Sequence, residues 1–295
     1  MSLRLALAQW QVGAPRSVEE FGARVASALD AAATAGAQIA VLPEYLALEL
    51  AAAFPGAVHA DFLRSLQALQ PLHETWIALF AAAARRHGMY VLAGTFLLRV
   101  GAERYRNRAY FFAPDGGVRH QDKLTLTGFE RAAGVIEAGD ALHVMDTVHG
   151  RVGIAVCYDS EFPLYARAQV EAGARLLLVP SCTDTAAGAT RVRLGCRARA
   201  LESQVFVAQA VTAGEAPWSP ALDRNTGVAA LYAPSDRGLP DDGVVAQAAP
   251  GEPWLHVDVD FGALAVAESA GQVANRRDWP AQERPAVRRA RVLPD

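Results

Sequence analysis

The sequence predicts a single α/β domain, with mixed sheets in the middle and helices outside. Short apolar, β-branched runs alternate along the chain with Ala-rich helical stretches, which is the pattern of an α/β fold. Several expected strands are joined by tight turns, so antiparallel hairpins accompany the parallel strands. No linker-like change of composition and no fixed-period repeat divides the 295 residues.

The expected strands are apolar runs, either alternating or continuous. Leu3–Trp10 begins with period-two alternation, and Leu176–Pro180 is apolar throughout. The turn Pro-Asp-Gly-Gly at 114–117 predicts a hairpin between Arg108–Ala113 and Val118–Lys123. The other expected strands are Gln38–Leu42, Tyr90–Leu98, Leu142–Val148, Arg151–Val156, Val205–Val211, Gly227–Ala233 and Trp254–Val259.

Helices are expected where helix-forming stretches lie between capping residues. Val18–Ala35 is Ala-rich, with Ser17 in the N-cap position and Gly36 just beyond its end. Leu124–Asp140 is punctuated by glycines and is expected to be irregular. The other expected helices are Asp61–Gln70, Leu72–His87, Phe162–Ala172 and Arg191–Gln204.

The main domain is expected to span residues 1–270, followed by an Arg-rich tail at 271–295. We expect this tail to pack on the domain or on a partner subunit. A solvated or partner-wrapping tail is favoured over nucleic-acid binding, because the net charge of the chain is −3 and no basic footprint is present at whole-chain level.

Composition excludes several protein classes. Hydrophobic residues make up 52% and charged residues 20%, which excludes a disordered or coiled-coil chain. No apolar run approaches the roughly 18 residues of a membrane span, and the alternating start does not predict a signal peptide. Three cysteines without a CxxC pair predict free thiols in the cytoplasm, with neither a disulfide framework nor a metal site.

Cys157 stands where an apolar strand gives way to a helix, in Gly-Ile-Ala-Val-Cys-Tyr-Asp-Ser-Glu-Phe-Pro. A thiol at such an elbow lies at a sheet edge near a helix N-terminus, which favours the thiolate. The backbone N–H of Tyr158 is placed to face a developing oxyanion. The alternative is a buried structural cysteine, the commonest fate of a free thiol. Cys182 and Cys196, which lack this context, illustrate that alternative.

A cysteine nucleophile needs a base and a group that stabilises negative charge. The seven histidines are scattered, so we expect surface or core roles for them. Glu44 follows an apolar strand, Lys123 ends a hairpin strand, and Glu130 lies in the irregular stretch. Such positions are where α/β sites assemble. Lys123 is the only lysine among 28 Lys and Arg residues. The alternative for Lys123 is that one lysine remained by accident, and the alternative for either glutamate taken alone is a solvated surface charge.

Three short motifs surround these residues. Glu44 stands in Val-Leu-Pro-Glu-Tyr, Lys123 in Gln-Asp-Lys-Leu-Thr-Leu, and Cys157 in Ala-Val-Cys-Tyr-Asp-Ser-Glu-Phe-Pro. Their order and approximate spacing resemble the Glu-Lys-Cys triad of the carbon–nitrogen hydrolase (nitrilase) superfamily. The resemblance covers roughly residues 3–260. Supporting pieces are Gly139-Asp140, Val179-Pro180-Ser181 and Arg197-Ala-Arg-Ala-Leu-Glu202.

The resemblance implies a four-layer αββα sandwich of nitrilase type, a homodimer or higher homo-oligomer, and no cofactor or metal. It implies that Cys157 attacks the amide carbon and that Glu44 acts as general base and acid. It implies that Lys123 and the Tyr158 N–H stabilise the oxyanion. Glu130 matches the family's frequent second glutamate, which positions the substrate and the lysine.

The residues around the cysteine resemble the amidase side of the superfamily. True nitrilases typically continue Cys-Trp-Glu, whereas this chain has Cys-Tyr-Asp, as in the omega-amidase-like and Nit-type branches. The context of Lys123 resembles a less characterised branch whose members are sometimes fused to an acetyltransferase, and no such domain fits in this chain. We expect hydrolysis of a small linear carboxamide through a thioester, which releases ammonia or a small amine. N-carbamoyl hydrolysis, nitrile hydrolysis and acyl transfer to an amine share the thioester and remain alternatives.

A different class of function is a catalytically silent binding or scaffold protein with the same fold. The presence of all three triad residues counts against it. The pocket itself is not defined by the sequence, although Tyr45, Phe129 and Trp218 are candidates for its lining. Aromatic residues are nevertheless core or surface residues more often than ligand contacts.

Overall fold

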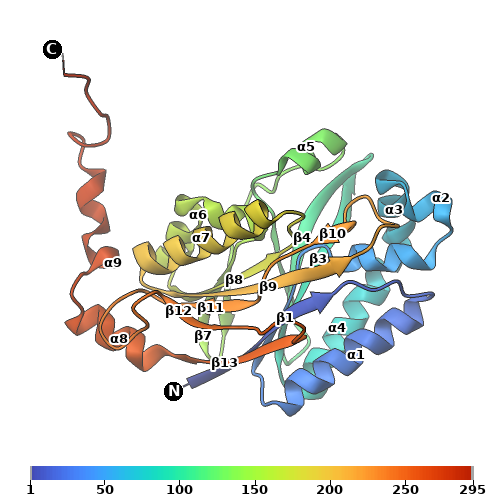
Figure 1. Cartoon of the computed structure of the whole chain (residues 1–295), viewed down its shortest axis with the longest axis horizontal. Coiled ribbons are helices and arrows are strands. Elements are labelled where there is room, and N and C mark those ends of the chain that lie inside the picture. Colours follow the sequence, from blue (N-terminus) through green and yellow to red (C-terminus); the bar gives the residue numbers. More distant parts are fainter. Residues whose placement is uncertain (1, 294–295) are drawn as a thin grey trace.

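The computed structural model describes residues 2–293 and confirms the α/β class (Figure 1). The strands are β1 (Ser2–Gln11), β2 (Ile39–Leu42), β3 (Tyr90–Gly101), β4 (Arg104–Phe112), β5 (Val118–Asp122), β6 (Val144–Thr147), β7 (Gly150–Ile154), β8 (Ala174–Ser181), β9 (Phe206–Glu215), β10 (Arg224–Asn225), β11 (Ala230–Tyr232), β12 (Val244–Gln247) and β13 (Trp254–Asp260). The α-helices are α1 (Val18–Thr34), α2 (Gly56–His59), α3 (Phe62–Leu69), α4 (His73–His87), α5 (Gly128–Ala133), α6 (Pro163–Glu171), α7 (Ala186–Ser203), α8 (Phe261–Ala270) and α9 (Asn275–Asp278), and the 3-10 helices are η1 (Leu46–Ala53), η2 (Gln70–Leu72), η3 (Cys157–Glu161) and η4 (Trp279–Glu283).

Strand β1 joins two half-sheets into one continuous system. The strand order is β5-β4-β3-β2-β1-β9-β8-β7-β6. Residues 2–8 of β1 pair with β13 and, over residues 5–7, with β2. Residues 9–11 pair with β9. Parallel and antiparallel pairs are mixed as expected, and contacts of β2 with β8 and β9 bring the two half-sheets together.

Helices cover the outer faces of both half-sheets, which completes the predicted sandwich. Helix α4 packs on β3 and β4 with α1 beside it, whereas α6 and α7 pack together on β7, β8 and β9 (Figure 1). Helix α1 begins at the predicted N-cap, because the Ser17 side chain accepts a hydrogen bond from the Glu20 N–H. Among the helices of residues 2–293, none combines the length and hydrophobicity that a bilayer span requires.

Several segments differ from expectation in secondary structure. The stretch expected to be irregular contains α5, whose first turn is fixed by a capping box between Thr127 and Glu130. Helix α7 starts at Ala186, five residues earlier than expected, because Thr185 caps it. Strands β10 and β12 and helix α8 were not expected from the sequence.

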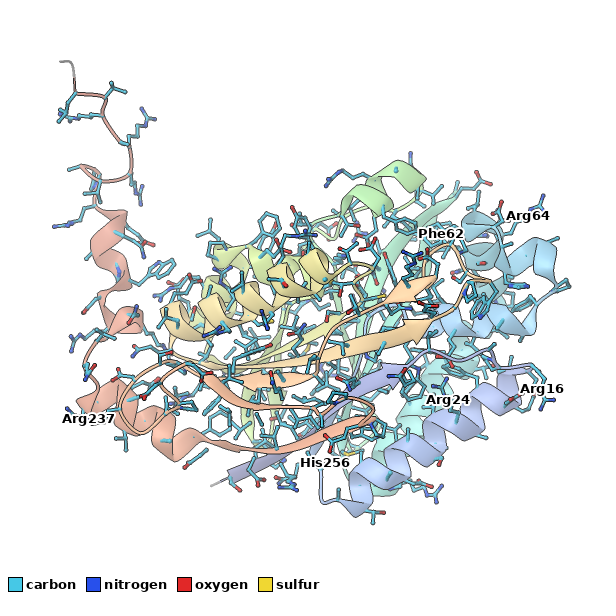
Figure 2. The ribbon with its side chains drawn as sticks, in the orientation of Figure 1. Arg16, Arg24, Phe62, Arg64, Arg237 and His256 are labelled. Carbon is cyan, nitrogen blue, oxygen red and sulfur yellow. The ribbon has the colours of Figure 1, made fainter. Side chains whose placement is uncertain are left out.

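An ion pair between half-buried Arg24 and buried Glu49 fixes α1 to the segment that follows β2. The Glu49 carboxylate accepts a hydrogen bond from Trp10 Nε1 at 2.6 Å and forms a salt bridge with Arg24. Arg24 projects from α1 (Figure 2), and its guanidinium lies over the Trp10 ring, 4.3 Å from the ring centroid. Helix α1, strand β1 and helix η1 are thereby held together immediately beyond Glu44.

The C-terminal tail leads away from the main body (Figure 1). Its first part is attached, since the Arg167 guanidinium lies 4.7 Å from the ring centroid of Trp279. The described residues beyond 283 are exposed. Packing of this tail on a partner subunit stays a prediction.

Gly94 allows two segments of the site to approach closely. It lies at φ +67° in an irregular part of β3, and a Cβ atom there would stand 2.0 Å from the Pro43 carbonyl oxygen. The neighbouring Thr95 hydroxyl accepts a hydrogen bond from the Tyr45 N–H at 2.8 Å. This contact places Glu44, which lies between Pro43 and Tyr45, against β3.

We therefore expect Gly94→Ala to destabilise the fold by about 3 kcal/mol or more, through the left-handed backbone and the clash together. Gly88→Ala is the matched control, because Gly88 has φ +60° but open space around it, and we expect a cost of about 1 kcal/mol there. Urea unfolding of both variants measures the difference. Equal losses would show that the approach to Pro43 is unimportant.

Candidate active site

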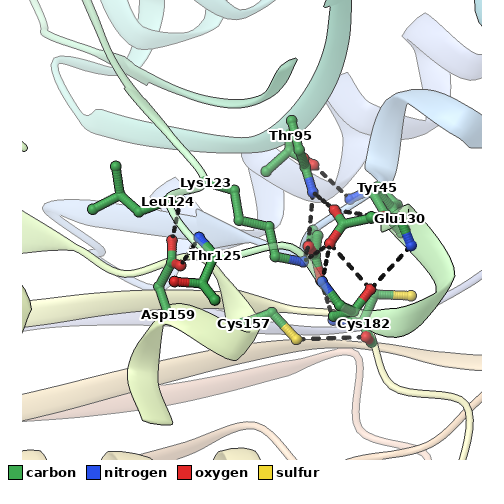
Figure 3. A network of polar contacts seen from close by, with 12 residues as sticks. Tyr45, Thr95, Lys123, Leu124, Thr125, Glu130, Cys157, Asp159 and Cys182 are labelled. Carbon is green, nitrogen blue, oxygen red and sulfur yellow. Dashed lines mark hydrogen bonds and ion pairs between the residues drawn. The ribbon is translucent and has the colours of Figure 1, made fainter. Parts of the chain in front are cut away.

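The predicted residues gather around one pocket at the carboxyl ends of β2, β7 and β8. The pocket has a volume of about 270 Å³, and its wall includes Glu44, Lys123, Cys157 and Tyr158. Glu130 lies directly behind this wall, where its Oε2 is 2.8 Å from Lys123 Nζ (Figure 3). The fold thus brings together residues that are more than a hundred positions apart in the sequence.

Cys157 opens the 3-10 helix η3 in a strained conformation, with φ +48°. Left-handed backbone at a non-glycine residue is costly and concentrates at functional sites. The Sγ atom lies 3.6 Å from the Cys182 carbonyl oxygen. Burial raises the pKa of the Cys157 thiol, Glu44 raises it further, and Lys123 opposes both only in part. The expected stabilisation of a resting thiolate is therefore wrong, and the thiol needs a base.

Glu44 is buried, and both of its carboxyl oxygens are engaged. Oε1 accepts hydrogen bonds from Asn107 Nδ2 and Lys123 Nζ, each at 2.8 Å, and Oε2 accepts one from the Cys182 N–H at 3.1 Å. Burial raises the pKa of Glu44, Lys123 lowers it and Glu130 raises it, with a net upward shift. A raised pKa suits a carboxyl that takes up and returns a proton.

Lys123 is 1% exposed and stands between two carboxyl groups. Its Nζ lies 2.8 Å from both Glu44 Oε1 and Glu130 Oε2. Burial alone would lower the pKa of Lys123, but the two carboxylates raise it well above its usual value. The only lysine of the chain is therefore a fixed positive charge at the back of the pocket.

Glu130 is held by α5 and by two side chains. Tyr45 OH and Asn107 Nδ2 donate to its Oε1 at 2.8 and 3.1 Å, and the Thr127 N–H donates to Oε2 at 2.9 Å. Burial would raise the pKa of Glu130, but Lys123 and these donors lower it. Glu130 is thus the ionised partner that balances the lysine.

Two polar side chains of the site were missed by the sequence analysis. Asn107 joins Glu44 and Glu130, and the signal for it was present, because it alternates with two arginines on β4 and so faces inward. Asp159 is the other missed residue. Its carboxyl oxygens accept the N–H groups of Leu124 and Thr125 at 2.9 and 2.8 Å (Figure 3).

Asp159 links the segment that contains Cys157 to the segment that follows Lys123. It lies two residues after Cys157, and its two donors directly follow Lys123. Burial raises the pKa of Asp159 to about 7, and the two N–H donors and Lys123 offset part of that rise. The carboxyl therefore titrates near neutrality while it bridges the two segments.

Of the three aromatic residues expected to line the pocket, two do so. Tyr45 and Phe129 line the pocket, whereas Trp218 is not among the lining residues and instead packs against His59, with 5.6 Å between ring centroids. Within residues 2–293 there is no cluster of three or more His, Cys, Asp or Glu side chains with the arrangement of a metal site.

Comparison with known proteins decides the family. A family model described as carbon-nitrogen hydrolase matches residues 4–239. The chain belongs to the carbon-nitrogen hydrolase family. It is therefore a hydrolase of carbon–nitrogen bonds other than peptide bonds, as predicted.

Individual proteins also resemble this chain over nearly its whole length. "Probable hydrolase YhcX" of Bacillus subtilis is 31% identical over 94% of this chain, which spans only 53% of that relative. "Omega-amidase NIT2" of Bos taurus is 29% identical over 90% of this chain and 91% of its own length. The crystal structure of Nit3 from Saccharomyces cerevisiae aligns with a TM-score of 0.73 at 20% identity, over 94% of this chain and 96% of that one.

The raised pKa of Asp159 makes a prediction for stability. The folded protein keeps this proton up to about pH 7, whereas the unfolded chain loses it near pH 4. Asp159 therefore contributes stability that is present in acid and is lost as the pH rises through about 7. The Asp159→Asn variant lacks this contribution. The free energy of unfolding of the parent minus that of the variant should therefore decrease as the pH rises from about 4 to about 7.

Urea unfolding at a series of pH values measures this difference. Asp146→Asn removes an exposed carboxyl and serves as control, for which we expect a nearly constant difference. A constant difference for Asp159→Asn as well would contradict the assignment.

Proposed function

We propose that this enzyme hydrolyses a small linear carboxamide through a thioester on Cys157, releasing ammonia or a small amine and a carboxylic acid. The observation that carries the proposal is the placement of a strained cysteine in one pocket with a carboxyl of raised pKa and a buried lysine. This set provides a nucleophile, a proton acceptor and a positive charge, which together suffice for acyl transfer.

Proton transfer is assigned to Glu44. It takes the thiol proton as Sγ of Cys157 attacks the carbonyl carbon, and it then gives that proton to the leaving nitrogen. The C–N bond breaks and the thioester remains. Glu44 next accepts a proton from the water that attacks the thioester, and the thiol is regenerated as the acid leaves. The raised pKa of Glu44 supports this role, because a carboxyl with a raised pKa is a stronger proton acceptor than an ordinary one.

Charge stabilisation is assigned to Lys123 and to the Tyr158 N–H. Negative charge develops on the carbonyl oxygen in each tetrahedral intermediate, and preorganised donors stabilise it. Lys123 Nζ is fixed by two carboxyl groups, so little reorganisation is needed. Glu130 then acts through Lys123, by holding its amine in place.

The size of the pocket and the relatives favour an amide substrate. A pocket of about 270 Å³ fits a small molecule and not a folded protein. The resemblance to the omega-amidase over 90% of this chain supports hydrolysis of an amide. N-carbamoyl compounds and nitriles are the alternatives within the family, and their products distinguish them.

We also propose that the enzyme works as a homodimer or a higher homo-oligomer. Leu164 of α6 and Leu194 and Leu201 of α7 are exposed on the outer layer of the sandwich. A helix pair that presents leucines to solvent is suited to face a second copy.

The nucleophile assignment is tested with Cys157→Ala, which we expect to remove all ammonia release from a panel of short amides. Acid-quenched parent enzyme should carry the acyl group on the peptide that contains Cys157, detected by mass. Cys196→Ala deletes a buried thiol in α7 outside the pocket and should retain activity. Glu44→Gln should lose about a hundredfold or more in turnover, because the proton acceptor is gone.

Parent-like turnover in Cys157→Ala would end the thioester mechanism. A parent enzyme that folds but releases no ammonia from any amide, and produces no acid from N-carbamoyl compounds or nitriles, would favour the silent binding protein.

A further inference from the structure

One charged residue of the pocket wall has no place in the mechanism above. Glu161 ends η3, the helix that begins with Cys157, and its side chain lines the same pocket. Four residues of 3-10 helix advance about 8 Å along the axis. Glu161 and Cys157 therefore lie at opposite ends of this short helix, which suits contact of Glu161 with the far end of a small linear substrate.

Glu161 is poorly satisfied within the described chain. Its side chain is 21% exposed, and its nearest cation among residues 2–293 is Arg191, whose Nε lies 3.6 Å from Oε1. That distance exceeds an ordinary N–H···O hydrogen bond. Burial raises the pKa of Glu161, and Arg191 offsets part of the rise. A half-buried carboxylate without a close hydrogen-bond donor is stabilised most by a ligand that supplies such a donor.

The other charged residues of the pocket wall are better hydrated. Arg191 is 61% exposed, and Asp184, Asp223 and Arg224 are also exposed. Water solvates these groups, so they need no ligand. Outside the catalytic cluster the wall carries three carboxylates and two guanidiniums, which leaves an excess of negative charge. Both observations favour a positively charged group near Glu161.

We propose that Glu161 binds a protonated amine at the end of the substrate remote from the scissile amide, so that the substrates are ω-amino carboxamides. The proposal rests on the proposed function, because it places the amide carbon at Cys157. The ammonium donates hydrogen bonds to the Glu161 carboxylate, and the exposed Arg191 is displaced toward solvent. Glu161 is thus a specificity-determining residue that takes no part in the chemistry.

Three amides of similar length test the charge preference. They are ω-aminopentanamide, neutral pentanamide and the anionic monoamide of glutaric acid, with ammonia release as the readout. We expect the parent to favour the amino amide over the neutral one by about tenfold or more in kcat/KM. Glu161→Gln should abolish this preference through KM, with kcat little changed, because a uniform binding interaction is lost.

Two control variants separate the neighbouring charges. Arg191→Gln should keep or strengthen the preference for the amino amide, since it removes the competing cation. Asp184→Asn removes an exposed carboxyl of the same wall and should change the preference by less than about twofold. A preference that survives in Glu161→Gln overturns the proposal. Preference for the anionic amide that is lost in Arg191→Gln also overturns it, in favour of carboxylate binding.

Binding separates this proposal from the proposed function. In a Cys157→Ala background, calorimetry should show that ω-aminopentanamide binds more tightly than pentanamide and that adding Glu161→Gln removes the difference. That result supports the role of Glu161 even if the parent hydrolyses none of the three amides, in which case only the proposed reaction fails. Equal binding of both amides to Cys157→Ala overturns the role of Glu161.

Discussion

The site depends on one buried lysine held between two carboxyl groups. Lys123 is removed from water, so its charge is tolerated only because Glu44 and Glu130 both lie 2.8 Å from Nζ. Loss of one partner in such a buried pair typically costs about 3–5 kcal/mol. Asn107 Nδ2 donates to both carboxyl groups and so links them to each other. The same contacts that stabilise the fold at this point therefore also set the positions of the groups that line the candidate active site.

Each member of this cluster comes from a different element, so the fold must hold these elements in register. Glu44 follows β2, Lys123 follows β5, Asn107 lies on β4 and Glu130 lies on α5. Left-handed backbone at Tyr45 and at Cys157, together with the close approach at Gly94, shows how tightly the chain is folded here. Such strained backbone conformations persist only where many surrounding contacts hold them in place. The rigid half-sheets on both sides supply that support.

Most of the architecture was predictable, because buried strands and hairpin turns leave strong local patterns. Three residues of the candidate site were predictable because Glu44 and Cys157 follow apolar runs and Lys123 ends a hairpin strand, each within a distinctive motif. Helix α5 had a signal that was not used, the Thr-x-x-Glu pattern of a capping box. Asp159 had none, since its role depends on a contact with residues 34 and 35 positions away. The importance of Glu161 emerges only when the wall of the pocket is known.

The burial of the lysine has a consequence for the surface of the protein. Because Lys123 is the only lysine and is 1% exposed, all other basic side chains on the surface are arginine or histidine. No lysine amine is available on the folded enzyme to acylating dyes, to amine-directed cross-linkers or to coupling onto an activated resin. Such reagents reach Lys123 only when the core around it opens, so incorporation of an amine-reactive label at this position would report unfolding of the candidate active site.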